Sequence, residues 1–191
     1  MKKLILVLLV AAIVLFGVSF ALNGFAAQNA QREHLWLMQT ILPGSESFTL
    51  EPYAGDDENI RSVHKAENGF VVEAVTYGYA GEITMLIGVN NEGFVTGLVV
   101  SEAHETLGIG SNILTDHEFL AQFLNGSGSF TVAGADAFSG ATGEAESEDA
   151  AAVDAISGAT VSSKAVIRCV NSAIAYVTGA DVSSGATSWG G

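Results

Sequence analysis

The feature that most constrains the fold is an apolar run near the start of the sequence. Residues 4–31 contain no charged side chain, and Leu4–Leu22 is almost wholly apolar. At about 1.5 Å per residue, a helix of this length crosses a hydrocarbon core of roughly 30 Å. A cleaved signal peptide is the alternative, but its apolar region usually spans about 7–15 residues and ends at an Ala-x-Ala-like site. The run is longer, and residues 24–26 (Gly-Phe-Ala) match such a site poorly. We therefore expect a retained transmembrane anchor over residues 1–27.

Charge indicates the orientation of this anchor. Lys2 and Lys3 precede the apolar run, and basic residues favour the cytoplasmic side. All 21 Asp and Glu residues follow the run, and the formal net charge is −14. We expect a single-pass protein of the cytoplasmic membrane, with its N-terminus inside and its domain on the extracytoplasmic face. The acidity of that domain argues against nucleic acid and anionic lipid as partners.

Several common kinds of redox site are excluded by composition. Cys169 is the single cysteine, which excludes an internal disulfide and the Cys-x-x-Cys patterns of iron–sulfur and haem sites. The four histidines are scattered, and the chain contains neither a Walker loop nor a Gly-x-Gly-x-x-Gly fingerprint. We expect Cys169 to be a small core residue. A redox cofactor would have to be held in another way.

Residue periodicity after the anchor predicts an α+β domain, an antiparallel sheet with helices packed on it. Strands are expected over residues 59–67, 69–80, 82–90 and 93–105, with a hairpin turn at Asn90–Gly93. A short helix over residues 116–124, capped by Thr115, and a strand over 129–133 follow. Residues 135–152 are expected to form a loop. Residues 160–178 are expected to form a helix with an apolar stripe made of Val161, Ala165, Val166, Cys169, Val170, Ala173, Ile174 and Val177.

These patterns divide the chain into four parts. The anchor over residues 1–27 is followed by a juxtamembrane helix and polar linker over residues 28–58. The α+β domain is expected over residues 59–179, and a flexible tail over residues 180–191. The aromatic residues along the chain are expected to serve in packing, and the sequence does not indicate which of them contacts a ligand; they include Trp36, Tyr77, Tyr79 and Phe94.

The stretch DAISGATVSSKAV, residues 154–166, opens the last predicted helix. One interpretation is structural, because Ser157 or Thr160 can cap the first backbone N–H groups. The other is functional, since a helix start offers unpaired N–H groups and partial positive charge to a phosphate. Small residues at 158 and 159 allow close approach, and the Thr160 hydroxyl can carry a phosphoester. Lys164 and Arg168, one and two turns further on, can help to neutralise its charge.

This stretch resembles the covalent-flavin motif of FMN-binding subunits in the Rnf and Na⁺-translocating NADH:quinone reductase families. The resemblance implies that Thr160 carries FMN through a phosphoester installed by a flavin transferase. Asp154 corresponds to the leading acid of the motif, while Ser157, Gly158 and Ala159 shape the turn around the phosphate.

A second segment, HETLGIGSN at residues 104–112, is similar to the Glu-Thr-Pro-Gly-Leu-Gly loop of the same families. The resemblance implies flavin contacts from Glu105, Thr106, Leu107 and Gly108, although Leu107 replaces the usual proline. The phrase Ser-Gly-Ala-Thr also ends at Thr142 and at Thr187. Acidic residues follow Thr142 and the chain end follows Thr187, so Thr160 is the expected attachment site, with a second flavin at Thr142 as an alternative.

The resemblance implies a membrane-anchored subunit that relays electrons through covalent FMN within an Rnf-type ferredoxin:NAD ion-translocating complex. Its partners would be the other membrane subunits of that complex. The alternatives are the related C subunit of a Na⁺-translocating NADH:quinone reductase and a non-redox, membrane-tethered binding or assembly module. A hydrolase with Thr160 as nucleophile is a weaker alternative, since no histidine lies near the motif in the sequence.

Overall fold

The computed structural model describes residues 32–103, 116–133 and 150–179. The chain forms two units, residues 1–37 and 38–191. A helix covers residues 32–41, so residues 32–37 are the described part of the first unit. The expected anchor over 1–27 and the expected tail over 180–191 lie outside the described residues. Within the described ranges, no helix combines the length and the apolar character needed to span a membrane.

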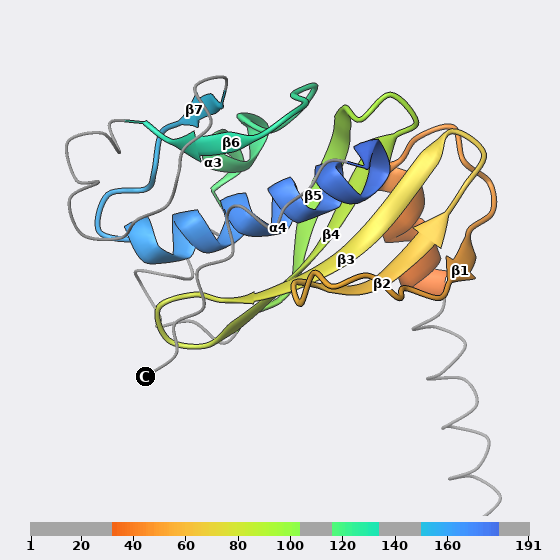
Figure 1. The fold of residues 1–191 in the computed structure, drawn as a ribbon, viewed down its shortest axis with the longest axis horizontal. Coiled ribbons are helices and arrows are strands. Elements are labelled where there is room, and N and C mark those ends of the chain that lie inside the picture. The colour runs from red at the N-terminus through yellow and green to blue at the C-terminus, as the bar shows by residue number, and fades with distance from the viewer. Residues whose placement is uncertain (1–31, 104–115, 134–149, 180–191) are drawn as a thin grey trace, which may run out of the picture. The chain divides into compact units, whose positions relative to one another are not determined.

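The second unit is built on a five-stranded antiparallel sheet whose strands lie in chain order (Figure 1). Its strands are β1 (Thr49–Glu51), β2 (Ile60–Lys65), β3 (Gly69–Tyr77), β4 (Glu82–Asn90) and β5 (Val95–Ala103). Strands β3 and β4 pair along their whole length, from Gly69 opposite Asn90 to Tyr77 opposite Glu82. Both strands are rich in β-branched residues, which pack well on a pleated surface. The predicted antiparallel meander is confirmed.

The turn between β4 and β5 is the predicted Asn90–Gly93 hairpin. The Asn90 side-chain oxygen accepts hydrogen bonds from the backbone N–H of Glu92 at 3.0 Å and of Phe94 at 2.9 Å. Gly93 has a φ of 87°, a conformation that glycine adopts at little cost. An asparagine that bonds its own backbone and a glycine with positive φ fix this turn locally.

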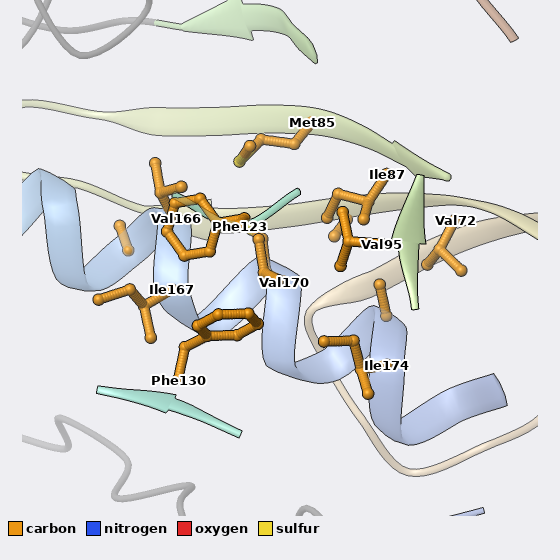
Figure 2. Close-up of a cluster of buried hydrophobic side chains, with 14 of the residues drawn as sticks. Val72, Met85, Ile87, Val95, Phe123, Phe130, Val166, Ile167, Val170 and Ile174 are labelled. Atoms are coloured by element: carbon orange, nitrogen blue, oxygen red, sulfur yellow. The ribbon is translucent and has the colours of Figure 1, made fainter. Parts of the chain in front are cut away.

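Helix α4 (Thr160–Thr178) covers one face of the sheet, against β3 and β4 (Figure 1). It begins and ends where the sequence predicts, and Gly179 closes it in the left-handed conformation at φ 70°. Figure 2 shows Val166, Val170 and Ile174 from α4 directed toward Met85 and Ile87 of the sheet. Burying each such side chain stabilises the fold by about 1.5–3 kcal/mol. Packing against the sheet therefore holds α4 in place.

A small second layer packs on α4 beside the sheet. It contains α3 (His117–Ala121) and the parallel two-stranded pair β6 (Phe130–Val132) and β7 (Ala151–Val153). Phe123 lies edge-on to Phe119 and Phe130, with ring centroids 5.4 and 5.1 Å apart (Figure 2 labels Phe123 and Phe130). The Asn171 amide of α4 accepts from Phe130 N at 2.9 Å and donates to Phe130 O at 3.0 Å. Helix α4 thus positions β6, and β6 positions β7, which leads into the motif.

The opposite face of the sheet is covered by residues 38–42. Gly88 and Gly97 pair across β4 and β5, and Gly88 alternates with residues that face α4. A Cβ atom at Gly88 would lie 2.4 Å from the Ile41 carbonyl oxygen, and one at Gly97 would lie 2.7 Å from Ile41 Cα. Thr96 Oγ1 donates to the same Ile41 carbonyl at 2.6 Å. The two glycines let the backbone at Ile41 lie directly on the sheet, with Met38, Ile41 and Leu42 buried.

Three local expectations differ from the structure. Strand β1 lies within residues 28–58, the stretch expected to be helix and linker, and β7 lies at the end of the expected loop over 135–152. Helix α3 is capped by Asp116 rather than Thr115, because the Asp116 carboxylate accepts from the N–H groups of Glu118 and Phe119, each at 3.0 Å. Both strands are three residues long, too short to show a periodic pattern.

Candidate functional site

The motif turn between β7 and α4 presents Thr160 on the surface. Ser157, Gly158 and Thr160 are exposed, whereas Ala159 is buried and its backbone occupies the N-cap position. Gly158 has a φ of 79°, and apart from its two chain neighbours no described residue has an atom within 4 Å of the place where its Cβ would be. The turn therefore requires glycine for its conformation and leaves open space beside the helix start.

The capping role proposed for Ser157 or Thr160 is wrong. Among the described residues, no side chain makes a capping hydrogen bond at the N-terminus of α4. The first N–H groups of a helix need partners, and a side-chain oxygen at the N-cap normally supplies one. The Thr160 hydroxyl is thus not used for capping. The helix start keeps the electropositive character that suits a phosphate.

Ser163, which sequence reasoning missed, holds the motif turn together. Its buried hydroxyl accepts a hydrogen bond from Ile156 N at 3.2 Å and donates one to Ala159 O at 3.0 Å. Through Ser163, these bonds connect Ile156 to Ala159 across the motif turn. The signal in the sequence was the pair Ser162-Ser163 near the start of the predicted helix. Both side chains lie on the buried side of that helix.

Replacing Ser163 with alanine is expected to lower the free energy of unfolding by about 1–3 kcal/mol, because Ile156 N loses its partner in a part-buried position. Urea denaturation measures this change. Ser157→Ala is the matched control, since Ser157 is exposed and surface changes usually stay within about 0.5 kcal/mol. Equal effects of the two substitutions would contradict the role assigned to Ser163.

Asp154, the leading acid of the motif, is held by its backbone and exposes its side chain. The Gln122 side-chain amide donates to Asp154 O at 3.3 Å, and its oxygen accepts from Asp154 N at 2.8 Å. This bidentate contact aligns the chain as it leaves β7. The Asp154 side chain is exposed, in the segment that leads from β7 to Thr160.

The loop between β3 and β4 lies against the first turns of α4. Ser162 Oγ accepts from Tyr79 N at 3.4 Å, and Arg168 Nη2 donates to Tyr77 O at 3.0 Å. Arg168 Nε also donates to Thr76 Oγ1 at 3.5 Å. Arg168, expected to help neutralise a phosphate, therefore orients this loop.

Several aromatic side chains that were expected to serve in packing keep much of their surface exposed. Tyr77 is 70% exposed and Tyr79 is 75% exposed, and Trp36 and Phe94 are also exposed. Val161, expected on the buried stripe of α4, is 50% exposed. Tyr79 and Val161 both lie near the start of α4, so the surroundings of Thr160 have a more apolar surface than the sequence pattern indicated.

Glu105, Thr106, Leu107 and Gly108 lie outside the described residues, as do the alternative attachment residues Thr142 and Thr187. Across the described ranges, no three His, Cys, Asp or Glu side chains form a group that could hold a metal ion.

Cys169 is fully buried in the core between α4 and the sheet, as predicted. Burial raises the pKa of its thiol from the ordinary 9.0 to about 12, and nearby Asp57 also raises it while Arg168 lowers it. Thiolate is the reactive form of cysteine. The position and the protonation state of Cys169 both favour an inert packing residue.

Cys169 in the folded protein is therefore expected to resist thiol-specific reagents at neutral pH and to react fully in urea. The pKa of the Cys169 thiol is higher in the folded protein than in the unfolded chain, so the neutral thiol stabilises the folded state. The stabilisation from the neutral thiol is complete below pH 9.0 and is lost as the pH rises toward about 12. Mass spectrometry of the labelled protein measures the reaction. Labelling of the folded chain as fast as that of the unfolded chain would contradict this description.

Comparison with known proteins identifies the family. The FMN-binding domain family matches residues 78–175, from the β3–β4 loop to the last turn of α4. The G subunit of an ion-translocating oxidoreductase complex from Methanosarcina acetivorans is 34% identical over 153 residues, covering 74% of this chain and 73% of the relative. The G subunit of the Na⁺-translocating ferredoxin:NAD⁺ oxidoreductase complex from Acetobacterium woodii is 32% identical over 157 residues, covering 71% and 70%.

The G subunit of the proton-translocating ferredoxin:NAD⁺ oxidoreductase complex from Clostridium ljungdahlii is 26% identical, and the match covers 93% of this chain and 89% of the relative. Among solved structures, the crystal structure of Shewanella oneidensis NqrC matches with a TM-score of 0.44 and 23% identity, covering 70% of this chain and 65% of that one. The resemblance inferred from the motifs is confirmed by the family match and by the G-subunit relatives. The chain belongs to the FMN-binding domain family, together with the G subunits of ion-translocating oxidoreductase complexes.

Proposed function

We propose that this protein is a membrane-anchored flavoprotein subunit that relays electrons through FMN esterified to Thr160. The complex would be of the Rnf type, exchanging electrons between ferredoxin and NAD and coupling this exchange to ion movement. The G-subunit names of the relatives support this assignment over the C subunit of a quinone reductase. The single observation that carries the proposal is the exposed, non-capping Thr160 hydroxyl at the start of α4, within the matched FMN-binding region.

The residues of the motif turn fit a phosphate ester. The Thr160 side chain is exposed, the space beside Gly158 is open among the described residues, and no described side chain caps the helix. A phosphodiester on Thr160 would lie at the electropositive end of a helix of 19 residues. Asp154 and Ser157 of the same turn are exposed as well. A buried hydroxyl or a capped helix end would have argued against the ester, and neither occurs in the described part of the turn.

Attachment at Thr160 requires an activated donor, because an alcohol does not displace hydroxide from a phosphate at a useful rate. A flavin–nucleotide phosphoanhydride meets this need. The Thr160 oxygen forms a bond to the flavin-side phosphorus, the bond to the nucleotide phosphate breaks, and a nucleoside monophosphate leaves. The threonine proton passes to a base, and we assign this step to a separate flavin transferase.

In the finished protein, the role of this chain is to hold and orient the cofactor. Bound FMN supplies the redox chemistry, since its ring system accepts one or two electrons. Thr160 fixes the phosphate end, and Gly158 lets the ester lie close to the backbone. Ser163 keeps the turn in shape, as its two hydrogen bonds indicate. Covalent attachment also prevents loss of the cofactor from a domain that we place outside the cytoplasm.

The proposal is tested by the mass of the mature protein, purified from its host membrane or after production with a flavin transferase. The expected mass exceeds that of the sequence by one FMN less one water, and peptide mapping should place the addition on Thr160. Purification without denaturation should also recover other membrane subunits. An unmodified chain with no visible flavin absorption would instead support a non-redox binding or assembly module.

A further inference from the structure

The loop between β3 and β4 presents an aromatic side chain beside the start of α4. The four loop residues, Gly78 to Gly81, are closed by a hydrogen bond from Gly78 N to Gly81 O at 2.8 Å. Tyr79 lies at the tip and is 75% exposed. Most of this aromatic side chain therefore stays accessible after the domain has folded.

The loop is fixed to α4 by polar side chains of the helix. Ser162, two residues after Thr160, accepts from Tyr79 N at 3.4 Å. Arg168 donates to Tyr77 O at 3.0 Å and to Thr76 Oγ1 at 3.5 Å, where β3 ends. The backbone of Tyr79 therefore has a defined position relative to the first turn of α4. An exposed side chain on a fixed backbone suits contact with another group.

Tyr77 and Tyr79 differ in the face that they present. Thr76 is buried and contacts α4 through Arg168, so strand alternation places the next side chain, Tyr77, on the sheet face away from α4. Tyr79 follows the strand end and is bonded to α4 itself. Of these two exposed tyrosines, Tyr79 is therefore the one beside Thr160. One turn of helix rises only about 5.4 Å, a span that the ribityl chain of an attached FMN can cross.

We propose that Tyr79 forms the protein surface against which the flavin ring lies when FMN is attached to Thr160. Aromatic rings favour offset-stacked or edge-on contact with other aromatic systems. Ligand sites are commonly lined by aromatic side chains placed beside a few polar groups. Tyr79 thus orients the ring, while Thr160 fixes the phosphate. This inference rests on the proposed function and adds a ring-contacting residue to the attachment site.

The test compares the native and denatured states of the flavin-carrying protein. A tyrosine in contact with a flavin quenches its fluorescence, because the phenol gives an electron to the excited ring and then takes it back. Native wild-type protein is expected to be strongly quenched relative to the same sample in urea. Tyr79→Ala should raise the native fluorescence several-fold and weaken the visible circular dichroism of the flavin.

Three further variants separate stacking from general effects. Tyr79→Phe should raise the fluorescence but keep the visible circular dichroism, because phenylalanine stacks without donating an electron. Tyr77→Ala and Phe94→Ala should leave both signals unchanged. Tyr77 is the matched control at the same strand end, and Phe94 lies in the β4–β5 turn, where Gly93 approaches Thr178 at the other end of α4.

A denaturing gel viewed under ultraviolet light first establishes the flavin content of every variant. Absence of flavin from the wild type overturns the proposed function itself. Equal flavin content with unchanged native signals in Tyr79→Ala and Tyr79→Phe overturns the assignment of Tyr79 alone. The same holds if Tyr77→Ala changes the signals as much as Tyr79→Ala does. Should Tyr79→Ala fail to acquire flavin, Tyr79→Phe still decides through its fluorescence.

Discussion

Thr160→Ala is expected to carry no covalent flavin, and the wild-type protein is expected to carry one per chain. The reason is chemical, since alanine has no oxygen with which to form the ester. The change should leave the fold intact, because Thr160 is exposed and its hydroxyl does not cap α4. A fluorescent band on a denaturing gel and the intact mass measure the attachment, and urea denaturation checks the stability.

The controls for this prediction lie in the same motif and in its repeats. Thr160→Ser keeps a hydroxyl and is expected to retain flavin, although the smaller side chain can slow attachment. Thr142→Ala and Thr187→Ala, at the ends of the other Ser-Gly-Ala-Thr copies, should leave the flavin content unchanged. A fluorescent band that survives Thr160→Ala and disappears in Thr142→Ala would place the ester at the other copy.

Phe123→Ala is expected to lower the free energy of unfolding by about 3–5 kcal/mol, the usual cost of removing a buried phenylalanine. Its ring is fully buried and lies between Phe119 and Phe130. The cavity would weaken the packing of α3 and β6 on α4. Strand β6 pairs with β7, which leads into the motif turn. Urea denaturation with the linear extrapolation measures the change.

Leu124→Ala is the matched control for Phe123→Ala. Leu124 is the next residue, but its side chain is 43% exposed, so its removal should cost well under about 1 kcal/mol. A decrease in the free energy of unfolding below about 1 kcal/mol in Phe123→Ala, or equal decreases in the two variants, would mean that this aromatic cluster does not stabilise the second layer.

Much of the fold follows from local patterns in the sequence. Strands β3 and β4 have long β-branched runs, and the Asn90–Gly93 turn has its own side-chain and glycine signals. Helix α4 has a long apolar stripe and a terminal glycine. Strands β1 and β7 were missed because each is three residues long and owes its conformation to a partner strand. For β7, that partner is β6, which α4 itself positions.

The candidate site could be predicted only in part. Small residues before a hydroxyl at a helix start identify Thr160 and the turn at Gly158. The contacts of Ser162, Ser163 and Tyr79 were not visible, because a hydroxyl in a helix or a tyrosine in a short loop has no local signature of its partner. Ser162 and Tyr79 are 83 positions apart in the chain, and that contact exists only after the sheet and α4 have packed.

The sequence separation of these contacts bears on the order of maturation. Arg168 reaches back 91 residues to Tyr77, and such non-local contacts form late because they require closure of a long chain segment. A newly synthesised chain can therefore expose Thr160, the proposed attachment residue, before the β3–β4 loop packs beside it. Under the proposed attachment, a flavin transferase would meet either the unfolded segment or the folded domain, and the folded domain would offer the hydroxyl in a single orientation. If the cofactor is attached at Thr160, the distance along the chain between this residue and the β3–β4 loop makes the order of folding and attachment a part of maturation.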